Sequence, residues 1–160
     1  MNDIGFCGDD CSRCPRYIAT MNNNPSELKK VADLWIRVGW RDEGTPIEEM
    51  ICYGCSSVRW CRYDNIRNCA RGIGISNCGE CANYPCDEIF QVFQKTESYA
   101  KQCKETCSKE DYICLTEAFF FKCKKLNEIN KKIFNYQRLS RVEKNTKPTV
   151  FPVLLLSVTV

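Results

Sequence analysis

Histidine is absent from this chain of 160 residues, and its absence excludes the commonest zinc enzymes. Without histidine the protein lacks the usual proton acceptor near neutral pH, and it cannot form the histidine-ligated zinc sites that hydrolyse substrates. Zinc-dependent hydrolysis would need cysteine ligands and a carboxylate such as Glu80. Glu80 lies within the motif CGEC at 78–81, where we expect a solvated turn residue and not a base. We therefore predict no catalytic residue and do not expect an enzyme.

Long apolar segments and repeated strand–helix units are missing as well. The first ten residues, MNDIGFCGDD, include acidic residues and no apolar run, so they do not resemble a secretory signal and we expect a cytoplasmic protein. The apolar run within 146–160 is shorter than the roughly 20 residues needed to cross a bilayer, so we predict no membrane partner. A chain of this length is about one ordinary domain. It is too short for the barrel of roughly 200 residues that a radical SAM enzyme, another user of the spacing CxxxCxxC, would need.

A strong charge of one sign is also missing, because the net charge is only +3. A zinc ion held by four thiolates carries about −2, so two such sites would leave the folded protein near neutral or slightly acidic. Residues 122–147 are locally basic, and we interpret them as a solvated helix face followed by a loose tail. The overall charge therefore does not indicate a nucleic-acid partner.

Cysteine, by contrast, is abundant, with ten of the fourteen cysteines in the first 86 residues. Thiols stay reduced in the cytoplasm, where clustered cysteines bind metal more often than they form disulfides. The pairs CYGC at 52–55 and CGEC at 78–81 have the spacing by which two thiolates of one tight turn grip a tetrahedral ion. We predict ten metal ligands: Cys7, Cys11, Cys14, Cys52, Cys55, Cys61, Cys69, Cys78, Cys81 and Cys86.

The identity of the metal and the pairing of its ligands stay open at this point. Zinc, as two ions, is the first choice, and two four-thiolate sites would use eight of the ten cysteines. One division places the cysteines of 7–14 with one ligand from the middle segment and those of 52–55 with the CGEC turn, but other divisions satisfy the same spacing. An iron–sulfur cluster is the alternative, because the spacing CxxxCxxC at 7–14 and the nearby prolines are typical of cluster-binding loops.

Helices are predicted between and after the cysteine groups. Asn24 and Pro25 begin a helix over 25–38, and a short helical turn after Thr45 leads to Cys52. Residues 52–86 are rich in glycine, asparagine and cysteine, so we expect knuckles and loops that metal holds together. Further helices over 87–103 and, after Ser108, to about 136 should pair as an antiparallel hairpin.

These elements predict a small α-rich, at most α+β, metal-stabilised domain in which cysteine zinc knuckles pack on a C-terminal helical hairpin. Its parts would be a cysteine-rich metal-binding region at 1–86 with the inserted helix, the hairpin of the same domain at 87–136, and a tail at 137–160. The tail would be a terminal strand, a packing segment or a disordered end.

The ordered cysteine motifs resemble a known family. The strings CGDDCSRCPRYIAT at 7–20, CYGC at 52–55, NIRNCARGIGISNCGECANYPCDEI at 65–89 and AFFFKCKKLNEI at 118–129 are similar to domain of unknown function 3795, over about residues 4–132. The resemblance implies a zinc-binding protein of unassigned function. Cysteines outside the pattern are interpreted as helix-face core positions, or as an extra site across the hairpin: Cys103, Cys107, Cys114 and Cys123.

Two kinds of binding partner remain after enzymes are set aside. The zinc knuckles could form a rigid platform for a protein partner, with the helical hairpin as a docking surface. Alternatively, the segment VRWCRYDNIRNCARG at 58–72 interleaves arginine with aromatic residues, as nucleic-acid-binding knuckles do. The residues predicted to contact nucleic acid are Arg59, Trp60, Arg62 and Tyr63.

Overall fold

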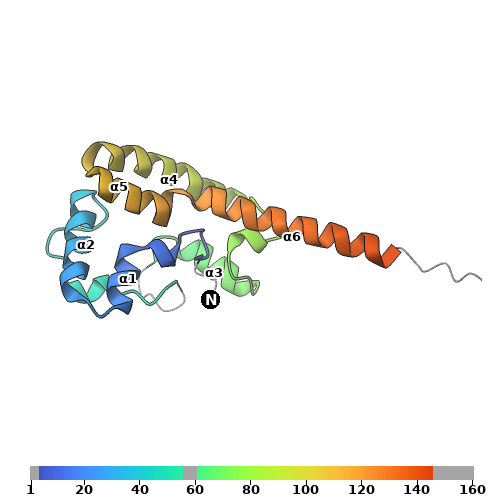
Figure 1. Cartoon of the computed structure of the whole chain (residues 1–160), viewed down its shortest axis with the longest axis horizontal. Coiled ribbons are helices and arrows are strands. Elements are labelled where there is room, and N and C mark those ends of the chain that lie inside the picture. The colour runs from blue at the N-terminus through green and yellow to red at the C-terminus, as the bar shows by residue number, and fades with distance from the viewer. Residues whose placement is uncertain (1–3, 56–60, 146–160) are drawn as a thin grey trace, which may run out of the picture.

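The computed structural model describes residues 4–55 and 61–145, which form helices and no strand (Figure 1). One isolated antiparallel bridge joins Ile4 and Asp10. The α-helices are α1 (Pro15–Met21), α2 (Pro25–Arg37), α3 (Asp64–Gly72), α4 (Asp87–Thr106), α5 (Lys109–Leu115) and α6 (Lys122–Asn145). Shorter helical turns are η1 (Cys11–Arg13), η2 (Ile47–Met50), η3 (Cys78–Glu80) and the π-helical η4 (Thr116–Phe120). The α-rich prediction is therefore confirmed for these residues.

Helix starts follow the capping residues that the sequence contains. The Asn24 side chain accepts a hydrogen bond from the Glu27 N–H at 3.1 Å, with Pro25 at the first helical position, so α2 begins where predicted. The Ser108 hydroxyl accepts from the Asp111 N–H at 3.1 Å and begins α5 in the same way. Both caps satisfy backbone donors that have no partner inside the helix.

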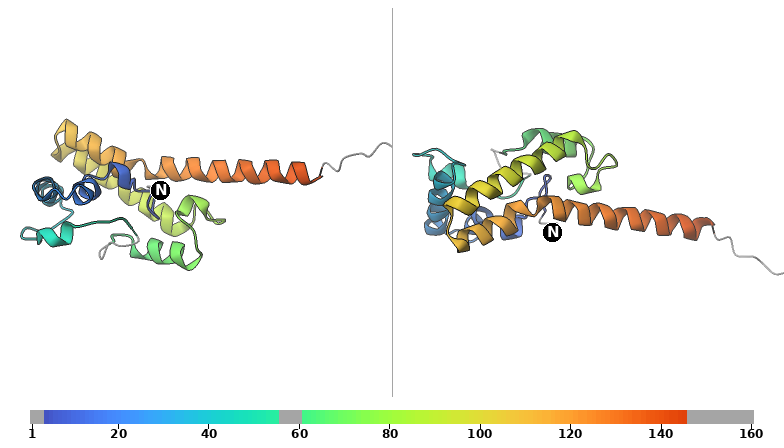
Figure 2. Two further views of the ribbon diagram at one scale, coloured as in Figure 1. Left: turned by 60° about the horizontal axis from the view of Figure 1, so that its bottom comes forward. Right: turned by 90° about the horizontal axis from the view of Figure 1, so that it is seen from above.

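The predicted hairpin is present, but its second arm is not one regular helix. α4 runs back along α5 and η4, and α6 continues the second arm past residue 136 to Asn145 (Figures 1 and 2). The π-helical turn η4 separates α5 from α6, and no proline or glycine marks it in the sequence. The far end of α6 extends away from the other helices, where Phe134 and Tyr136 are 67% and 74% exposed.

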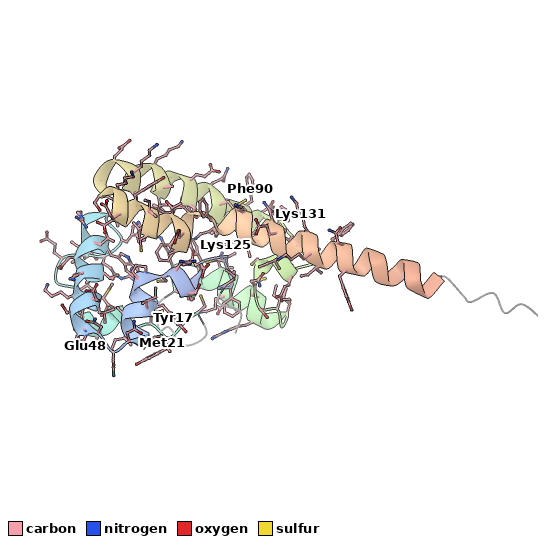
Figure 3. The ribbon with its side chains drawn as sticks, in the orientation of Figure 1. Tyr17, Met21, Glu48, Phe90, Lys125 and Lys131 are labelled. Atoms are coloured by element: carbon pink, nitrogen blue, oxygen red, sulfur yellow. The ribbon has the colours of Figure 1, made fainter. Side chains whose placement is uncertain are left out.

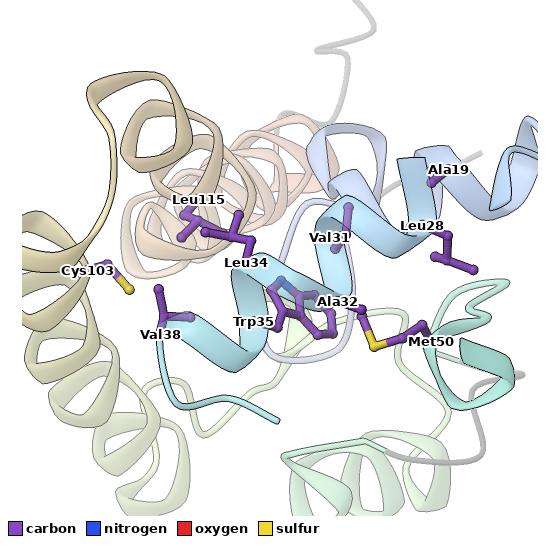
Figure 4. Packing of buried hydrophobic residues seen from close by; sticks show 10 residues of the cluster. All are labelled: Ala19, Leu28, Val31, Ala32, Leu34, Trp35, Val38, Met50, Cys103 and Leu115. Atoms are coloured by element: carbon purple, nitrogen blue, oxygen red, sulfur yellow. The ribbon is translucent and has the colours of Figure 1, made fainter. Parts of the chain in front are cut away.

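Two hydrophobic clusters form the core. The first lies between α1, α2, η2, α4 and α5. In it, Trp35 of α2 packs with Met50 of η2, and Cys103 faces in from α4 (Figure 4). The second lies between the N-terminal loop, α3, η3, the first half of α4 and the start of α6, and it includes Cys7, Ile66, Ile89 and Leu126. The turn η3 packs on α6, where Asn130 Nδ2 donates to the Gly79 carbonyl at 3.1 Å.

The expectation that residues 52–86 are only knuckles and loops is wrong. α3 occupies 64–72, and its Ile66 and Ala70 are buried with Tyr63 in the second cluster or beside it. The helix forms because Ile66 and Ala70 share a face and Arg67 pairs with Asp64 at 2.5 Å, which sequence reading passed over among the cysteines. α1, which follows Cys14, was not predicted either, although Pro15 is a typical first residue of a helix.

Among the described helices, none combines the length and the apolar character needed to span a membrane. The apolar segment at 146–160 lies outside the described residues, and the division of the chain into three parts stays a prediction.

Candidate cysteine centres

The CYGC turn is held against the first cysteine motif by two residues of α1. The buried Arg16 side chain donates to the carbonyls of Met50, Glu49 and Ile51 at 2.5, 2.6 and 3.1 Å. Thr20 Oγ1 accepts from the Cys52 N–H at 3.1 Å. Because α1 begins directly after Cys14, these bonds bring the motif at 7–14 beside the motif at 52–55.

Five of the predicted ligands line one cavity. They are Cys11, Cys14, Cys52, Cys55 and Cys61, around a space of about 150 Å³ that Asp9 and several aromatic residues also line. A hydrogen bond with Cys11, followed by burial, raises the pKa of Cys55. Burial raises the pKa of Cys14 to about 12, and the nearby Cys52 adds to this rise. Without metal, Cys14 and Cys55 therefore stay protonated near neutral pH.

Cys7 is not among the residues that line this cavity. It is 3% exposed and packs in the second hydrophobic cluster, and burial followed by Asp9 raises its pKa well above the ordinary value. The loop around it is close to Cys55, since a Cβ added to Gly5 would lie 2.7 Å from Cys55 Sγ. Cys7 thus has the surroundings of a core residue, while its predicted role as a ligand stays a prediction.

Four further predicted ligands line a second cavity of about 230 Å³. Cys69 comes from α3, Cys78 begins the turn η3, Cys81 follows it, and Cys86 precedes the first residue of α4. Burial raises the pKa of Cys78 to about 12, with further contributions from Cys86, Cys81 and Cys69. Three separate elements therefore bring four thiols to one place.

The η3 turn is fixed by polar side chains that are not ligands. Asn77 Oδ1 accepts from the Gly79 N–H at 3.0 Å, and Asn77 Nδ2 donates to Glu80 Oε1 at 3.2 Å. Glu80 Oε2 accepts from the Ser76 N–H at 2.9 Å. Glu80 is therefore a half-buried residue that closes the turn, whereas the sequence suggested a solvated one. Asn77 itself is fully buried, and sequence reading missed it.

The grouping differs from the one division that the spacing suggested. Cys52 and Cys55 lie with Cys11 and Cys14, and not with the CGEC turn, because Arg16 and Thr20 hold the two motifs together. As placed, no three cysteine, aspartate or glutamate side chains within 4–55 and 61–145 meet closely enough to hold one ion. The donor chemistry of each group nevertheless fits a thiolate-binding metal, since four or more sulfurs face one cavity.

The four cysteines outside the family pattern do not form a third site in the described chain. Cys103 is fully buried in the first cluster, as expected of a core position, and burial raises its pKa to about 12. Cys107 hydrogen-bonds to it at the end of α4. Cys114 cannot share a continuous helix face with them, because α4 ends at Thr106 and α5 begins at Lys109. Cys123 accepts from Asn127 Nδ2 at 3.4 Å.

The predicted nucleic-acid contacts are only partly placed. Arg59 and Trp60 lie outside the described residues. Arg62 is exposed and its guanidinium lies 4.0 Å from the Tyr99 ring centroid, while Tyr63 is 9% exposed and contacts Lys122. A buried Tyr63 is not available for a base to stack on from solution.

The sequence model of one protein family, described as protein of unknown function (DUF3795), matches residues 3–91. The match includes all ten predicted ligands but ends before the segment at 118–129 that also resembled the family. No curated protein and no solved structure matches the chain.

Proposed function

Because this chain belongs to the DUF3795 family of proteins of unknown function, we propose its role from its own cysteines: a protein with two structural, all-cysteine zinc sites that supports binding to a protein partner. One site uses Cys69, Cys78, Cys81 and Cys86. The other uses Cys11, Cys14, Cys52 and Cys55. Cys7 is then a core residue, and Cys61 is an extra thiol at the edge of the site of Cys11, Cys14, Cys52 and Cys55.

The observation that carries the proposal is the convergence of four thiols from α3, η3 and the start of α4 on one cavity. Hydrophobic packing alone does not require four cysteines at this place, because leucine or valine fills such space at no risk of oxidation. Tetrahedral zinc takes four thiolates, and the CxxC turn supplies two of them from one knuckle.

Zinc bound at these sites would cross-link the separate elements from which the four thiols of each site come. The chain's own residues orient the ligands: Arg16 and Thr20 fix the CYGC turn, and Asn77 and Glu80 fix the CGEC turn. Since the thiols must lose their protons to bind, loading with zinc should release protons near neutral pH.

The docking role is supported by apolar side chains exposed beside the site of Cys11, Cys14, Cys52 and Cys55. Ile18 and Met21 on α1 are 41% and 55% exposed, and Ile51 and Tyr53 flank Cys52 with 42% and 61% of their surface exposed. Figure 3 places Met21 and Tyr17 on the outer side of α1, near η2. Exposed apolar groups on a rigid, cross-linked surface favour a protein partner.

The proposal is tested by elemental analysis and an absorption spectrum of the chain purified without oxygen. We expect about two zinc ions per chain and no absorbance band near roughly 400 nm. Cys78→Ser should lose about one zinc, whereas Cys123→Ser, a control outside both groups, should keep both. Stoichiometric iron with sulfide would replace the proposal with an iron–sulfur protein.

A further inference from the structure

The cavity lined by the first cysteine group, which is Cys11, Cys14, Cys52 and Cys55, also has an aromatic wall that the zinc proposal does not use. Trp40, just after α2, is its centre: the Trp40 ring lies 6.0 Å from Trp35, 5.5 Å from Phe119, 6.4 Å from Phe120 and 6.3 Å from Tyr99, centroid to centroid. These rings come from three regions of the chain and all face one space. A structural zinc site needs thiolates and does not need such a wall.

Two hydrogen-bond donors of this wall have no acceptor. Within residues 4–55 and 61–145, the indole N–H groups of Trp35 and Trp40 are buried and make no hydrogen bond. Trp35 is only 6% exposed, so water does not readily replace the missing acceptor (Figure 4). Buried donors are nearly always satisfied, and each one left without a partner costs about 1–3 kcal/mol. Both tryptophans line the cavity, which points to an acceptor that enters it.

Cations surround the same space. The Arg16 and Arg41 guanidinium carbons lie 5.3 and 5.4 Å from the Trp35 ring centroid, and the Arg62 guanidinium carbon lies 4.0 Å from that of Tyr99. Arg41 Nη1 also donates to the backbone carbonyl of Trp40 at 2.8 Å. Burial, followed by the charges of Arg16 and Arg62, lowers the pKa of Arg41. Glu49 and Asp42 raise this pKa in part, but neither residue lines the cavity.

The charge in the cavity is positive with or without metal. Arg16, Arg41, Arg62 and Lys122 line it, and among the described residues Asp9 is the only carboxylate that does. Asp9 pairs with Lys122 at 2.8 Å. Four cations less one carboxylate leave three positive charges, and a four-thiolate zinc site of about −2 would still leave about one.

We propose that this cavity binds a small aromatic monocarboxylate, with its ring against Trp40 and its carboxylate accepting hydrogen bonds from the Trp35 and Trp40 indoles beside the arginines. A volume of about 150 Å³ suits a ligand of one ring, since sites for larger ligands are bigger. The apolar wall binds the ring by excluding water, and the donors and cations choose an anion over a neutral molecule. The preference for an anion does not depend on zinc, because the sign of the charge is the same with and without the metal.

Benzoate is the probe, and the indole N–H signals of the full-length, nitrogen-15-labelled chain are the readout. We expect the Trp35 and Trp40 signals, assigned with Trp35→Phe and Trp40→Phe, to shift saturably with a dissociation constant below about 1 mM. Benzamide, which has the same ring without the charge, should bind about tenfold more weakly.

The paired substitution Arg41→Gln and Arg62→Gln should weaken benzoate binding about tenfold or more. The matched control is Arg37→Gln, which removes an arginine that pairs with Asp111 on the surface and does not line the cavity. Equal binding of benzamide and benzoate, or indole signals that do not move, would overturn the proposal. The comparison of the two probes on the unaltered chain decides the question even if the paired variant does not fold.

Discussion

At the scale of single residues, Arg16 is the side chain on which the first cysteine group most depends. Its guanidinium is buried, although arginine is usually exposed, and it donates to three consecutive carbonyls that precede Cys52. Without Arg16, the carbonyls of residues 49–51 would lose the side-chain donor that each of them has in the structure. Arg16 therefore replaces the backbone pairing that a regular helix or strand would supply.

Arg16→Met should destabilise the protein by about 3 kcal/mol, because it keeps most of the side-chain volume but leaves these carbonyls without a donor. Arg13→Met is the control: Arg13 is 63% exposed and lies 3.7 Å from Glu117 in a surface pair, so its loss should cost less than about 1 kcal/mol. Urea unfolding of both variants measures the difference. Similar midpoints for the two variants would show that Arg16 holds nothing in place.

Sequence reading succeeds at this scale where the interaction is local. The caps Asn24 and Ser108 were predicted because each bonds to a backbone N–H three residues further along the chain. Arg16 was not predicted to be important, because its acceptors are more than 30 residues away and nothing near Arg16 in the sequence reveals them. The signal that does exist is the motif CPRY at 14–17, which is part of the resemblance to the family.

At the scale of elements, the packing of η3 on α6 decides how the second cysteine group is oriented. This group is Cys69, Cys78, Cys81 and Cys86. Gly79 lies at the contact, and a Cβ there would be 2.8 Å from the Leu126 carbonyl oxygen and 3.1 Å from Ile129 Cβ. A helix backbone does not move aside easily, so only glycine fits between the turn and α6.

Gly79→Ala should therefore destabilise the protein by about 2 kcal/mol through overpacking, and it should weaken zinc retention at the second group. Gly72→Ala is a matched control at the end of α3, where a Cβ would meet nothing within 4 Å. The control should stay within about 0.5 kcal/mol of the unaltered chain or be slightly more stable. Thermal unfolding compares the two, and equal losses would contradict the tight contact.

α6 is also joined to the N-terminal loop by a carboxylate whose effect depends on pH. Asp10 Oδ2 lies 2.9 Å from Lys125 Nζ, and Asp10 Oδ1 accepts from the Ser12 hydroxyl at 2.6 Å. Burial alone would raise the pKa of Asp10, but the bonds from Ser12 and Lys125 outweigh it and lower the pKa below 3.8. The folded state thus favours the charged form, so the contribution is present above pH 3.8 and is lost as the pH falls through the folded-state pKa.

Asp10→Asn should lower the free energy of unfolding by about 1 kcal/mol at pH 7, and this difference should shrink toward zero as the pH falls below 3.8. Asp33→Asn removes an exposed carboxylate that lies 3.4 Å from Lys29, and it should change little at either pH. Unfolding by urea at several pH values measures both. A difference for Asp10→Asn that persists unchanged at low pH would rule out the ion pair as its cause.

The helices were predicted well where an apolar stripe was long and poorly where it was short. α2 and α4 have many apolar residues at helical spacing, so their positions followed from the sequence. α3 has only two buried residues, Ile66 and Ala70, and Cys69 and the polar residues around them hid the pattern. The π-helical turn η4 was beyond prediction, because it depends on how the second arm packs on α4 and η1.

At the scale of the whole molecule, the arrangement of helices sorts the cysteines into two groups. The motifs were visible in the sequence, but their partners were not, since Cys11 and Cys55 come together only when α1 holds the segment before Cys52. The aromatic wall of the first cavity could not be predicted from the sequence for the same reason. Its rings come from the end of α2, from α4 and from η4, which are distant in the sequence.

The central claim is that zinc in this protein is bound by sulfur alone. X-ray absorption at the zinc edge of the purified, zinc-loaded chain tests it most directly. We predict about four sulfur neighbours per zinc at about 2.3 Å and no nitrogen or oxygen neighbour. A first shell that contains nitrogen or oxygen, or fewer than about four sulfurs per zinc, would contradict the claim.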